Sequence, residues 1–281
     1  MDFTSKKNVQ NLLKKYQTRP LKKLGQNFLI NKRVIKKMIE AAQLKPKEVV
    51  LEIGPGIGTL TIKLSKSVKK VIAVEKDPKM IEILKETLKN FSNIKIIRDD
   101  ILKIKNWKSE IGNSFKIVAS LPFYLTTPAI RKFLENVEIR PQQITLIVQK
   151  EVGQRICACP PKMSILAVSV QFYATCKIVS YVSKKSFWPS PEVDSVILQI
   201  TPLINTERKL INSDLFFRIV KAGFLHPRKQ LINNLSQGLN ISRDKIKNWL
   251  SENNIKYEQR AETLSIENWI TLTKSFSFVV K

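Results

Sequence analysis

Short, nearly continuous apolar segments alternate with amphipathic segments through the first half of the chain. The apolar segments are rich in β-branched residues, a pattern typical of strands buried on both faces of a sheet. A helix is predicted after the second of them, with Asp77 as its N-cap and Pro78 in its first turn. This alternation predicts an α/β fold with a mostly parallel sheet and helices on both faces. The segments are EVVLEI (48–53), VIAVE (71–75), IKII (94–97), FKIVA (115–119) and ITLIVQ (144–149).

Different patterns flank this α/β region on both sides. Before the first strand, apolar positions within 34–42 recur at helical spacing behind Asn31, which we expect to cap a helix. After the last parallel strand, KIVSYV (177–182) and VDSVILQI (193–200) predict a closing pair of strands. Strand signals then stop, and four apolar stripes at helical spacing predict a small all-α domain at the C-terminus.

These patterns divide the chain into three expected parts: a basic arm over residues 1–23, an α/β domain over 24–204 and a helical domain over 205–281. The arm carries seven Lys or Arg and a single acid, Asp2, with only scattered apolar positions. We therefore expect it to be mobile or to lie on the surface. The chain does not approach the roughly 18 consecutive apolar residues of a membrane span, so no membrane partner is expected.

Composition narrows the class of protein. The 281 residues include 49 Lys and Arg against 23 Asp and Glu, a formal net charge of +26. A positive excess of this size on a folding chain indicates a polyanionic partner, most often nucleic acid. The 43% hydrophobic content is enough for a packed core and excludes a disordered or fibrous chain. Three cysteines without a framework spacing fit a reducing, cytoplasmic location, and one histidine predicts no metal site.

The first candidate site lies where three predicted strands end. In LEIGPGIGTL, Gly54 and Gly56 form a turn in which the backbone can take positive φ and a ligand can approach the main chain. Glu75 ends the second strand, where a carboxylate can accept both hydroxyls of a ribose. Asp100 follows the third strand and is placed to accept from an adenine amino group. Together they predict a cofactor that contains adenosine, and both NAD and S-adenosylmethionine meet that description.

The end of a fourth strand distinguishes these cofactors. It continues into SLPFYLTTP, and a polar residue, a proline and an aromatic residue here are typical of methyltransferases that act on amino groups of bases. The Ser120 side chain and the Leu121 carbonyl can accept the two N–H groups of an adenine amine and free its lone pair. Pro122 stiffens the turn, and Phe123 can stack on an extruded base. Positioning then supplies most of the rate, and S-adenosylmethionine is favoured over NAD.

Nearly the whole chain from Leu24 resembles the small-subunit ribosomal RNA adenine dimethyltransferase family. The resemblance implies a Rossmann-like class I methyltransferase domain and an enzyme of ribosome biogenesis. It implies transfer of four methyl groups from S-adenosylmethionine to two adjacent adenosines in a hairpin near the 3′ end of small-subunit RNA. The matching segments, in order, are LGQNFL (24–29), EIGPGIGTLT (52–61), VEKD (74–77), DIL (100–102), LPFYLTTP (121–128), VQKEVGQRI (148–156), FWPSPEVDS (187–195) and FLHPRKQLINNL (224–235).

The resemblance also assigns roles to residues, and it implies that Phe187 joins Phe123 around the target base.

The distribution of charge, independently of the resemblance, leads us to expect that basic residues of the helical domain contact RNA phosphates, among them Arg228 and Lys229. The expected partner is RNA within a pre-30S-like particle, bound by a monomer. The residues expected to hold the cofactor are Gln26, Asn27 and Leu29 at its methionine side, and Gly54, Gly56, Glu75, Asp100 and Ser120 along the rest of it.

One position departs from the family, which normally has Asn where this chain has Ser120. Serine keeps an acceptor oxygen but is shorter and lacks the amide donor. Related base-amino methyltransferases use Ser before the Pro, so we interpret the activity as retained.

Two alternative functions stay open. One is the related large-subunit RNA methyltransferase that confers macrolide resistance, against which PRKQLINNL (227–235) argues. The other is a catalytically weakened assembly or nucleic-acid-binding factor on the same fold.

Overall fold

A computed structural model of the protein describes residues 2–104, 111–112, 114–135, 140–203, 208 and 210–278. The chain divides into two compact units. The first contains Met1–Gly153 and Cys176–Pro202, and the second contains Gln154–Thr175 and Leu203–Lys281. Among the described residues, none of the helices is long and apolar enough to cross a bilayer.

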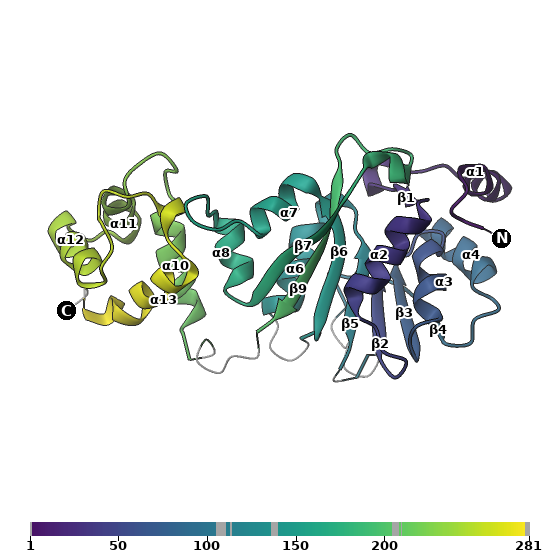
Figure 1. The fold of residues 1–281 in the computed structure, drawn as a ribbon, viewed down its shortest axis with the longest axis horizontal. Helices are drawn as coiled ribbons and strands as arrows, with labels where there is room; N and C mark the ends of the chain where they lie inside the picture. The colour runs from purple at the N-terminus through teal and green to yellow at the C-terminus, as the bar shows by residue number, and fades with distance from the viewer. Residues whose placement is uncertain are drawn as a thin grey trace. The chain divides into compact units, whose positions relative to one another are not determined.

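A seven-stranded sheet runs through the described residues of the α/β region, in the order β4-β3-β2-β5-β6-β9-β7 (Figure 1). The strands β4, β3, β2, β5 and β6 pair in parallel, and β9 is antiparallel to β6. Each strand predicted from the sequence is present, which confirms the α/β class with a mostly parallel sheet. The strands are β2 (Val49–Ile53), β3 (Lys70–Glu75), β4 (Ile94–Arg98), β5 (Lys116–Ser120), β6 (Gln143–Gln149), β7 (Ala174–Val182) and β9 (Ser195–Pro202).

Helices connect the parallel strands and cover the sheet. Right-handed crossovers place the helices between β2 and β4 on one face and the helix between β5 and β6 on the other. The two helix starts predicted from caps are confirmed, because Asn31 accepts from the backbone N–H groups of Arg33 and Val34, and Asp77 accepts from that of Lys79. The helices are α2 (Lys32–Ala42), α3 (Thr59–Ser65), α4 (Pro78–Thr87), α6 (Thr126–Glu135) and α7 (Lys150–Ile156).

The N-terminal segment expected to be a mobile or surface-lying arm contains a helix, α1 (Lys6–Lys15), that packs on the first unit. Its buried residues include Leu12 and Leu13, which belong to one apolar cluster with Phe28 and Met80. At its end, the Lys15 ammonium pairs with the Glu86 carboxylate at 2.6 Å. The basic side chains therefore lie on the outer face of an anchored amphipathic helix.

The second unit contains α8 (Ile165–Gln171), α10 (Ser213–Gly223), α11 (Leu231–Leu239), α12 (Arg243–Glu252) and α13 (Ile266–Ser275). Each of the four predicted apolar stripes lies on one of the last four helices and is buried in one cluster. Residues 154–175 were expected in the α/β domain but lie in this unit, because Phe172 after α8 stacks on Phe216 with ring centroids 4.1 Å apart. The expected boundary at 204/205 falls within residues 204–207, which are outside the described residues.

The C-terminal end of α2 is closed by a buried cation from the sheet. The Lys116 ammonium donates to the backbone carbonyl of Gln43 at 2.6 Å and pairs with the Glu48 carboxylate at 3.1 Å. The side-chain amides of Gln143 and Gln199 both donate to the Ala41 carbonyl, at 2.7 and 2.6 Å. These contacts satisfy the carbonyl groups that a helix end leaves without partners and place positive charge at the negative end of the helix dipole.

Replacing Lys116 by Met should lower the free energy of unfolding by about 2 kcal/mol. Removing one partner of a buried ion pair leaves the other charge uncompensated, which typically costs about 3–5 kcal/mol. The effect should be smaller here because the Glu48 side chain keeps 16% of its exposure. Urea unfolding measures it, with Lys79→Met as the control, since Lys79 forms an exposed pair with Glu82. Equal stabilities of the two variants would contradict the role of Lys116.

Candidate active site

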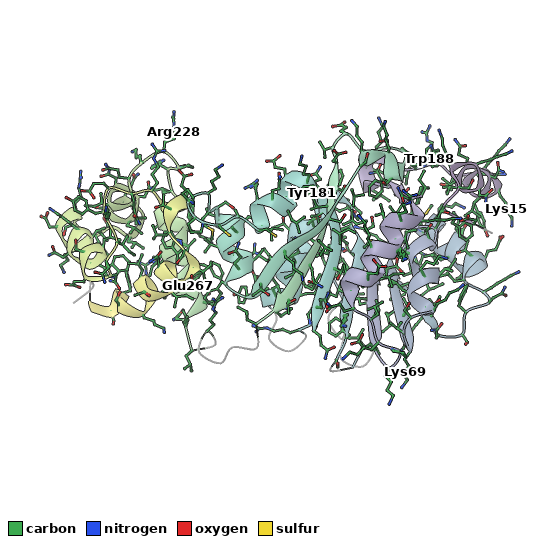
Figure 2. All side chains as sticks on the ribbon, viewed as in Figure 1. Lys15, Lys69, Tyr181, Trp188, Arg228 and Glu267 are labelled. Atoms are coloured by element: carbon green, nitrogen blue, oxygen red, sulfur yellow. The ribbon has the colours of Figure 1, made fainter. Side chains whose placement is uncertain are left out.

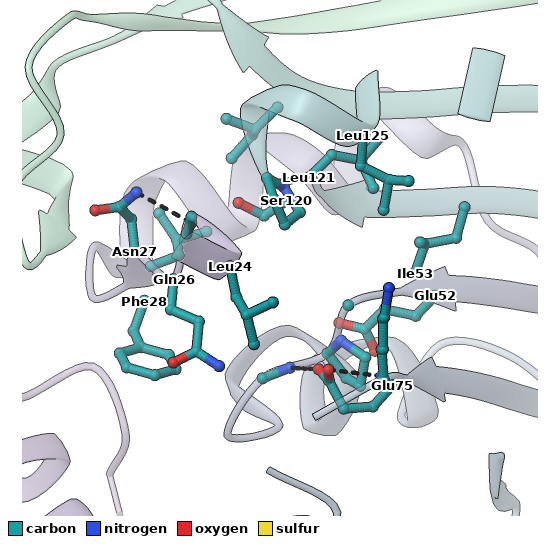
Figure 3. Close-up of a pocket in the computed structure, with 18 of the residues that line it drawn as sticks. Leu24, Gln26, Asn27, Phe28, Glu52, Ile53, Glu75, Ser120, Leu121 and Leu125 are labelled. Carbon is teal, nitrogen blue, oxygen red and sulfur yellow. Dashed lines mark hydrogen bonds between the residues drawn. The ribbon is translucent and has the colours of Figure 1, made fainter. Parts of the chain in front are cut away.

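A cavity of about 250 Å³ opens where the parallel strands end (Figure 3). Ser120 and Leu121 from the end of β5 lie on one side, Gln26 and Phe28 on a second, and Glu75 from the end of β3 on a third. The structure brings together all the site residues that the sequence predicted within the first unit. They are Gln26, Asn27, Leu29, Gly54, Gly56, Glu75, Asp100, Ser120, Leu121, Pro122, Phe123 and Phe187.

The glycine turn and the SLPF loop share this cavity. Gly54 and Gly56 have φ of +67° and +58°, a backbone conformation that glycine adopts without strain. A Cβ atom on Gly54 would lie 3.9 Å from the Pro122 ring, and one on Gly56 would lie 3.3 Å from the Phe28 ring. Side chains at these positions would therefore fill space between the turn, the loop and the cover of the cavity.

The segment 24–29 covers the cavity and is held there by its own polar side chains. The Gln26 side chain donates to the Asp77 carboxylate at 2.6 Å and accepts from the Leu21 backbone N–H at 2.9 Å. The Asn27 side chain donates to the Gly25 carbonyl at 3.2 Å. These bonds hold the backbone of the segment in a fixed conformation, so that the cover has a defined shape.

A two-stranded ribbon joins this cover to the aromatic residue expected at the target base. The strand β1 (Phe28–Leu29) pairs antiparallel with β8 (Phe187–Trp188), and Leu29 faces Phe187 in the register. Gly25 brings the cover close to the SLPF loop, because a Cβ atom there would lie 3.1 Å from Pro122. The ribbon thus places Phe187 in the wall of the cavity that Phe123 also lines.

The two carboxylates predicted to hold adenosine are fixed by neighbouring donors. Glu75 accepts the backbone N–H groups of Lys76, Asp77 and Gly56 at 2.8, 2.9 and 3.1 Å. Burial raises its pKa, and these hydrogen bonds oppose the shift. Asp100 accepts from the Lys76 ammonium at 2.8 Å, and this hydrogen bond lowers the pKa of Asp100. Both groups keep further lone pairs for a ligand, since a carboxylate can accept about four hydrogen bonds.

Sequence reasoning assigned no role to Glu52, which also lines the cavity. Its side chain is 2% exposed, and its Oε2 atom has no hydrogen-bond partner among the described residues. Burial raises the pKa of Glu52 to about 8, and the charge of Glu75 adds to the shift. Glu52 is the first residue of the E-x-G-x-G-x-G motif, so the sequence already marked its position. It did not reveal whether the carboxyl group at this strand end is buried or exposed.

A short 3₁₀ turn, η2 (Phe123–Leu125), follows Pro122 and presents its residues in different directions. Leu125 is buried, while Tyr124 is exposed at the cavity. The Ser120 hydroxyl makes no hydrogen bond to a described residue. It is therefore available to a ligand.

Arg228 and Lys229 belong to the second unit, in the connection between α10 and α11, and do not line the cavity. Figure 2 shows the Arg228 side chain extending away from both helices. Both residues are exposed, as a contact with phosphate requires.

Comparison with known proteins gives close matches over almost the full length. A family profile described as ribosomal RNA adenine dimethylase matches residues 18–274. The ribosomal RNA small subunit methyltransferase A of Dehalococcoides mccartyi strain CBDB1 is 40% identical over 271 residues, covering 96% of this chain and 92% of the relative. The protein of the same name from Clostridioides difficile strain 630 is 38% identical over 280 residues, covering 97% and 96%.

Two solved structures share the fold with a TM-score of 0.73. A dimethyladenosine transferase from Plasmodium falciparum is 26% identical, and the match covers 89% of this chain and 97% of that one. The 23S rRNA methyltransferase ErmE is 23% identical, with 89% of this chain and all of that chain covered, a similarity that supports the fold alone.

Proposed function

The chain belongs to the ribosomal RNA adenine dimethylase family, and we propose that it methylates adenine amines of small-subunit ribosomal RNA with S-adenosylmethionine. The observation that carries the proposal is the meeting of the glycine turn, two strand-end carboxylates and the SLPF loop in one cavity. The substrate is a pair of adjacent adenosines in the 3′-terminal hairpin, within an assembling small subunit. The protein acts on it as a monomer in the cytoplasm.

The cavity suits S-adenosylmethionine in shape and in donor set. Gly54 and Gly56 leave bare backbone along one wall, where a Cβ atom would take up the space. Glu75 would accept from the ribose hydroxyls and Asp100 from the adenine amine, while the segment 24–29 would cover the methionine end. When bound, the cofactor supplies an electrophilic methyl group on a positively charged sulfur.

The SLPF loop prepares the acceptor. An adenine amine is a weak nucleophile because its lone pair is delocalised into the ring. The Ser120 hydroxyl and the Leu121 carbonyl accept its two N–H groups and draw the nitrogen toward tetrahedral geometry, and Phe123 and Phe187 hold the ring. Pro122 has no N–H to compete for those acceptors. The amine becomes acidic once methylated, so no strong base is required.

Affinity for RNA comes from the basic surface. The formal charge of +26 favours binding to phosphates, and exposed residues such as Arg228 and Lys229 supply contacts that carry no sequence information. Choice of the target therefore depends on the cavity and on the shape of the RNA.

The test is methyl transfer from tritiated S-adenosylmethionine to small subunits purified from cells that lack this modification. We expect up to four methyl groups per particle, located by mass spectrometry on two neighbouring adenosines. Large subunits and already methylated small subunits serve as controls. Label in large-subunit RNA would favour the macrolide-resistance alternative, and binding without any label would favour the assembly-factor alternative.

Changing Ser120 to Asn should leave turnover on these particles equal or higher, because the family normally has Asn here and its amide oxygen also accepts. Changing Ser120 to Ala should lower turnover about tenfold, since one hydrogen bond of about 1.4 kcal/mol is lost. Single-turnover kinetics with saturating cofactor measure both. A large loss in Ser120→Asn would contradict the role assigned to the side chain.

A further inference from the structure

Tyr124 is an exposed aromatic residue at the edge of the cavity. Its exposure is 54%, and among the described residues the large exposed hydrophobic side chains that line the cavity are Leu102 and Tyr124. The Tyr124 hydroxyl makes no hydrogen bond to a described residue. Hydrogen bonding to the described residues therefore does not account for an aromatic ring that is more than half exposed in this place.

The ring of Tyr124 is presented by a rigid part of the fold. The backbone N–H of Leu125 donates to the Pro122 carbonyl at 2.9 Å, which closes the turn that contains Tyr124. Leu125 is 8% exposed and Thr126, the first residue of α6, is 2% exposed. The backbone of Tyr124 is therefore fixed between this turn and a buried helix start, so the ring projects from an ordered part of the fold.

The surroundings of Tyr124 suit a nucleotide. The phenol lies near enough to Lys76 to affect the pKa of that ammonium, and Lys76 and Lys103 both act on the Asp100 carboxylate. The Lys76 ammonium pairs with the Asp100 carboxylate at 2.8 Å and its side chain is 59% exposed, so it can also approach a phosphate beside the ring. An aromatic face with cations next to it is the combination that binds single-stranded nucleic acid through stacking and phosphate contacts.

We propose that Tyr124 is the stacking platform for the nucleotide adjacent to the adenosine being methylated. The inference rests on the proposed function, in which two neighbouring adenosines are substrates. When one base lies between Phe123 and Phe187, its neighbour stays outside the cavity, where Tyr124 is the exposed ring. The platform holds one adenosine while the other reacts, and the two can exchange places without release of the RNA.

The experiment compares Tyr124→Ala, Tyr124→Phe and a control, Tyr181→Ala, in the full-length protein. Tyr181 is 61% exposed on β7, contacts Lys150 and does not line the cavity. Each variant is assayed on unmethylated small subunits, with the methyl groups on each adenosine counted by mass spectrometry. Cofactor affinity is measured separately by calorimetry with S-adenosylhomocysteine.

We expect Tyr124→Ala to lower kcat/KM for the particle about tenfold, through KM, because the variant loses the stacking contact with one base. Particles with one modified adenosine should accumulate, and Tyr124→Phe should recover most of the loss because it keeps the ring. Cofactor affinity should stay within twofold, and Tyr181→Ala should match the parent.

Two results would overturn the proposal. Weaker cofactor binding in Tyr124→Ala with an unchanged KM for the particle would show that the ring covers the cofactor instead. An unchanged KM and unchanged product distribution would show that the ring contacts neither. If the parent protein does not methylate the particles, the proposed function itself is refuted. This outcome is recognised because the parent and the Tyr181→Ala control fail together.

Discussion

Glu75→Ala should weaken S-adenosylmethionine binding by a factor on the order of 1,000. The carboxylate is placed to accept from both ribose hydroxyls, and each hydrogen bond to a charged group contributes about 1.5–3 kcal/mol. Two such bonds correspond to about 4 kcal/mol, or three factors of ten in the dissociation constant. In the parent, the Glu75 carboxylate also fixes the wall of the cavity by accepting the backbone N–H groups of Lys76, Asp77 and Gly56. The variant loses these hydrogen bonds as well.

Calorimetric titration with S-adenosylhomocysteine measures this effect without RNA. Glu82→Ala is a matched control, because Glu82 is an exposed carboxylate on α4, the helix that follows β3, where it pairs with Lys79 and does not line the cavity. The control should bind like the parent. A loss of less than about tenfold in Glu75→Ala would mean that the ribose is held by other groups.

The strands were predictable because a strand buried on both faces needs a continuous apolar segment. The helix α1 was not, although Val9, Leu12 and Leu13 stand at helical spacing, because a short stripe among many lysines also fits an unfolded arm. The place of residues 154–175 was hidden for another reason. It depends on Phe172 meeting Phe216, and such long-range contacts leave no local signal.

The convergence of the candidate residues in one cavity was predictable, because the topology of the sheet does most of the placement. Parallel strands bring their carboxyl ends to one edge of a sheet, so polar residues after several strands converge even when they are far apart in sequence. The two-residue ribbon that sets Leu29 opposite Phe187 is too short for any period to show. The exposure of Tyr124 depends on the three-residue turn after Pro122, and the sequence does not reveal the orientation of that turn.

Glu52 should make the stability of the protein fall as the pH rises toward 8. Burial raises its pKa from 4.5 to about 8, so between these values the folded protein keeps a proton that the unfolded chain releases. The folded state then binds more protons than the unfolded state, and the free energy of unfolding decreases with rising pH. At about 1.4 kcal/mol per pH unit, the decrease attributable to this group is of order 4 kcal/mol.

Glu52→Gln should remove that decrease, because the amide resembles the protonated acid and has no proton to lose. Urea unfolding from pH 5 to pH 8.5 measures this effect. The free energy of unfolding of Glu52→Gln, relative to the parent, should rise by several kcal/mol over this range, while the pH dependence of Glu82→Gln should parallel that of the parent.

A cationic ligand in the cavity favours the ionised form of Glu52, so cofactor binding near pH 7 should release a proton in the parent and not in Glu52→Gln. Calorimetry in buffers of different ionisation enthalpy detects that release. Parallel stability curves for Glu52→Gln and the parent would mean that the buried carboxyl is already ionised, and the charge facing the cofactor would then be negative before binding.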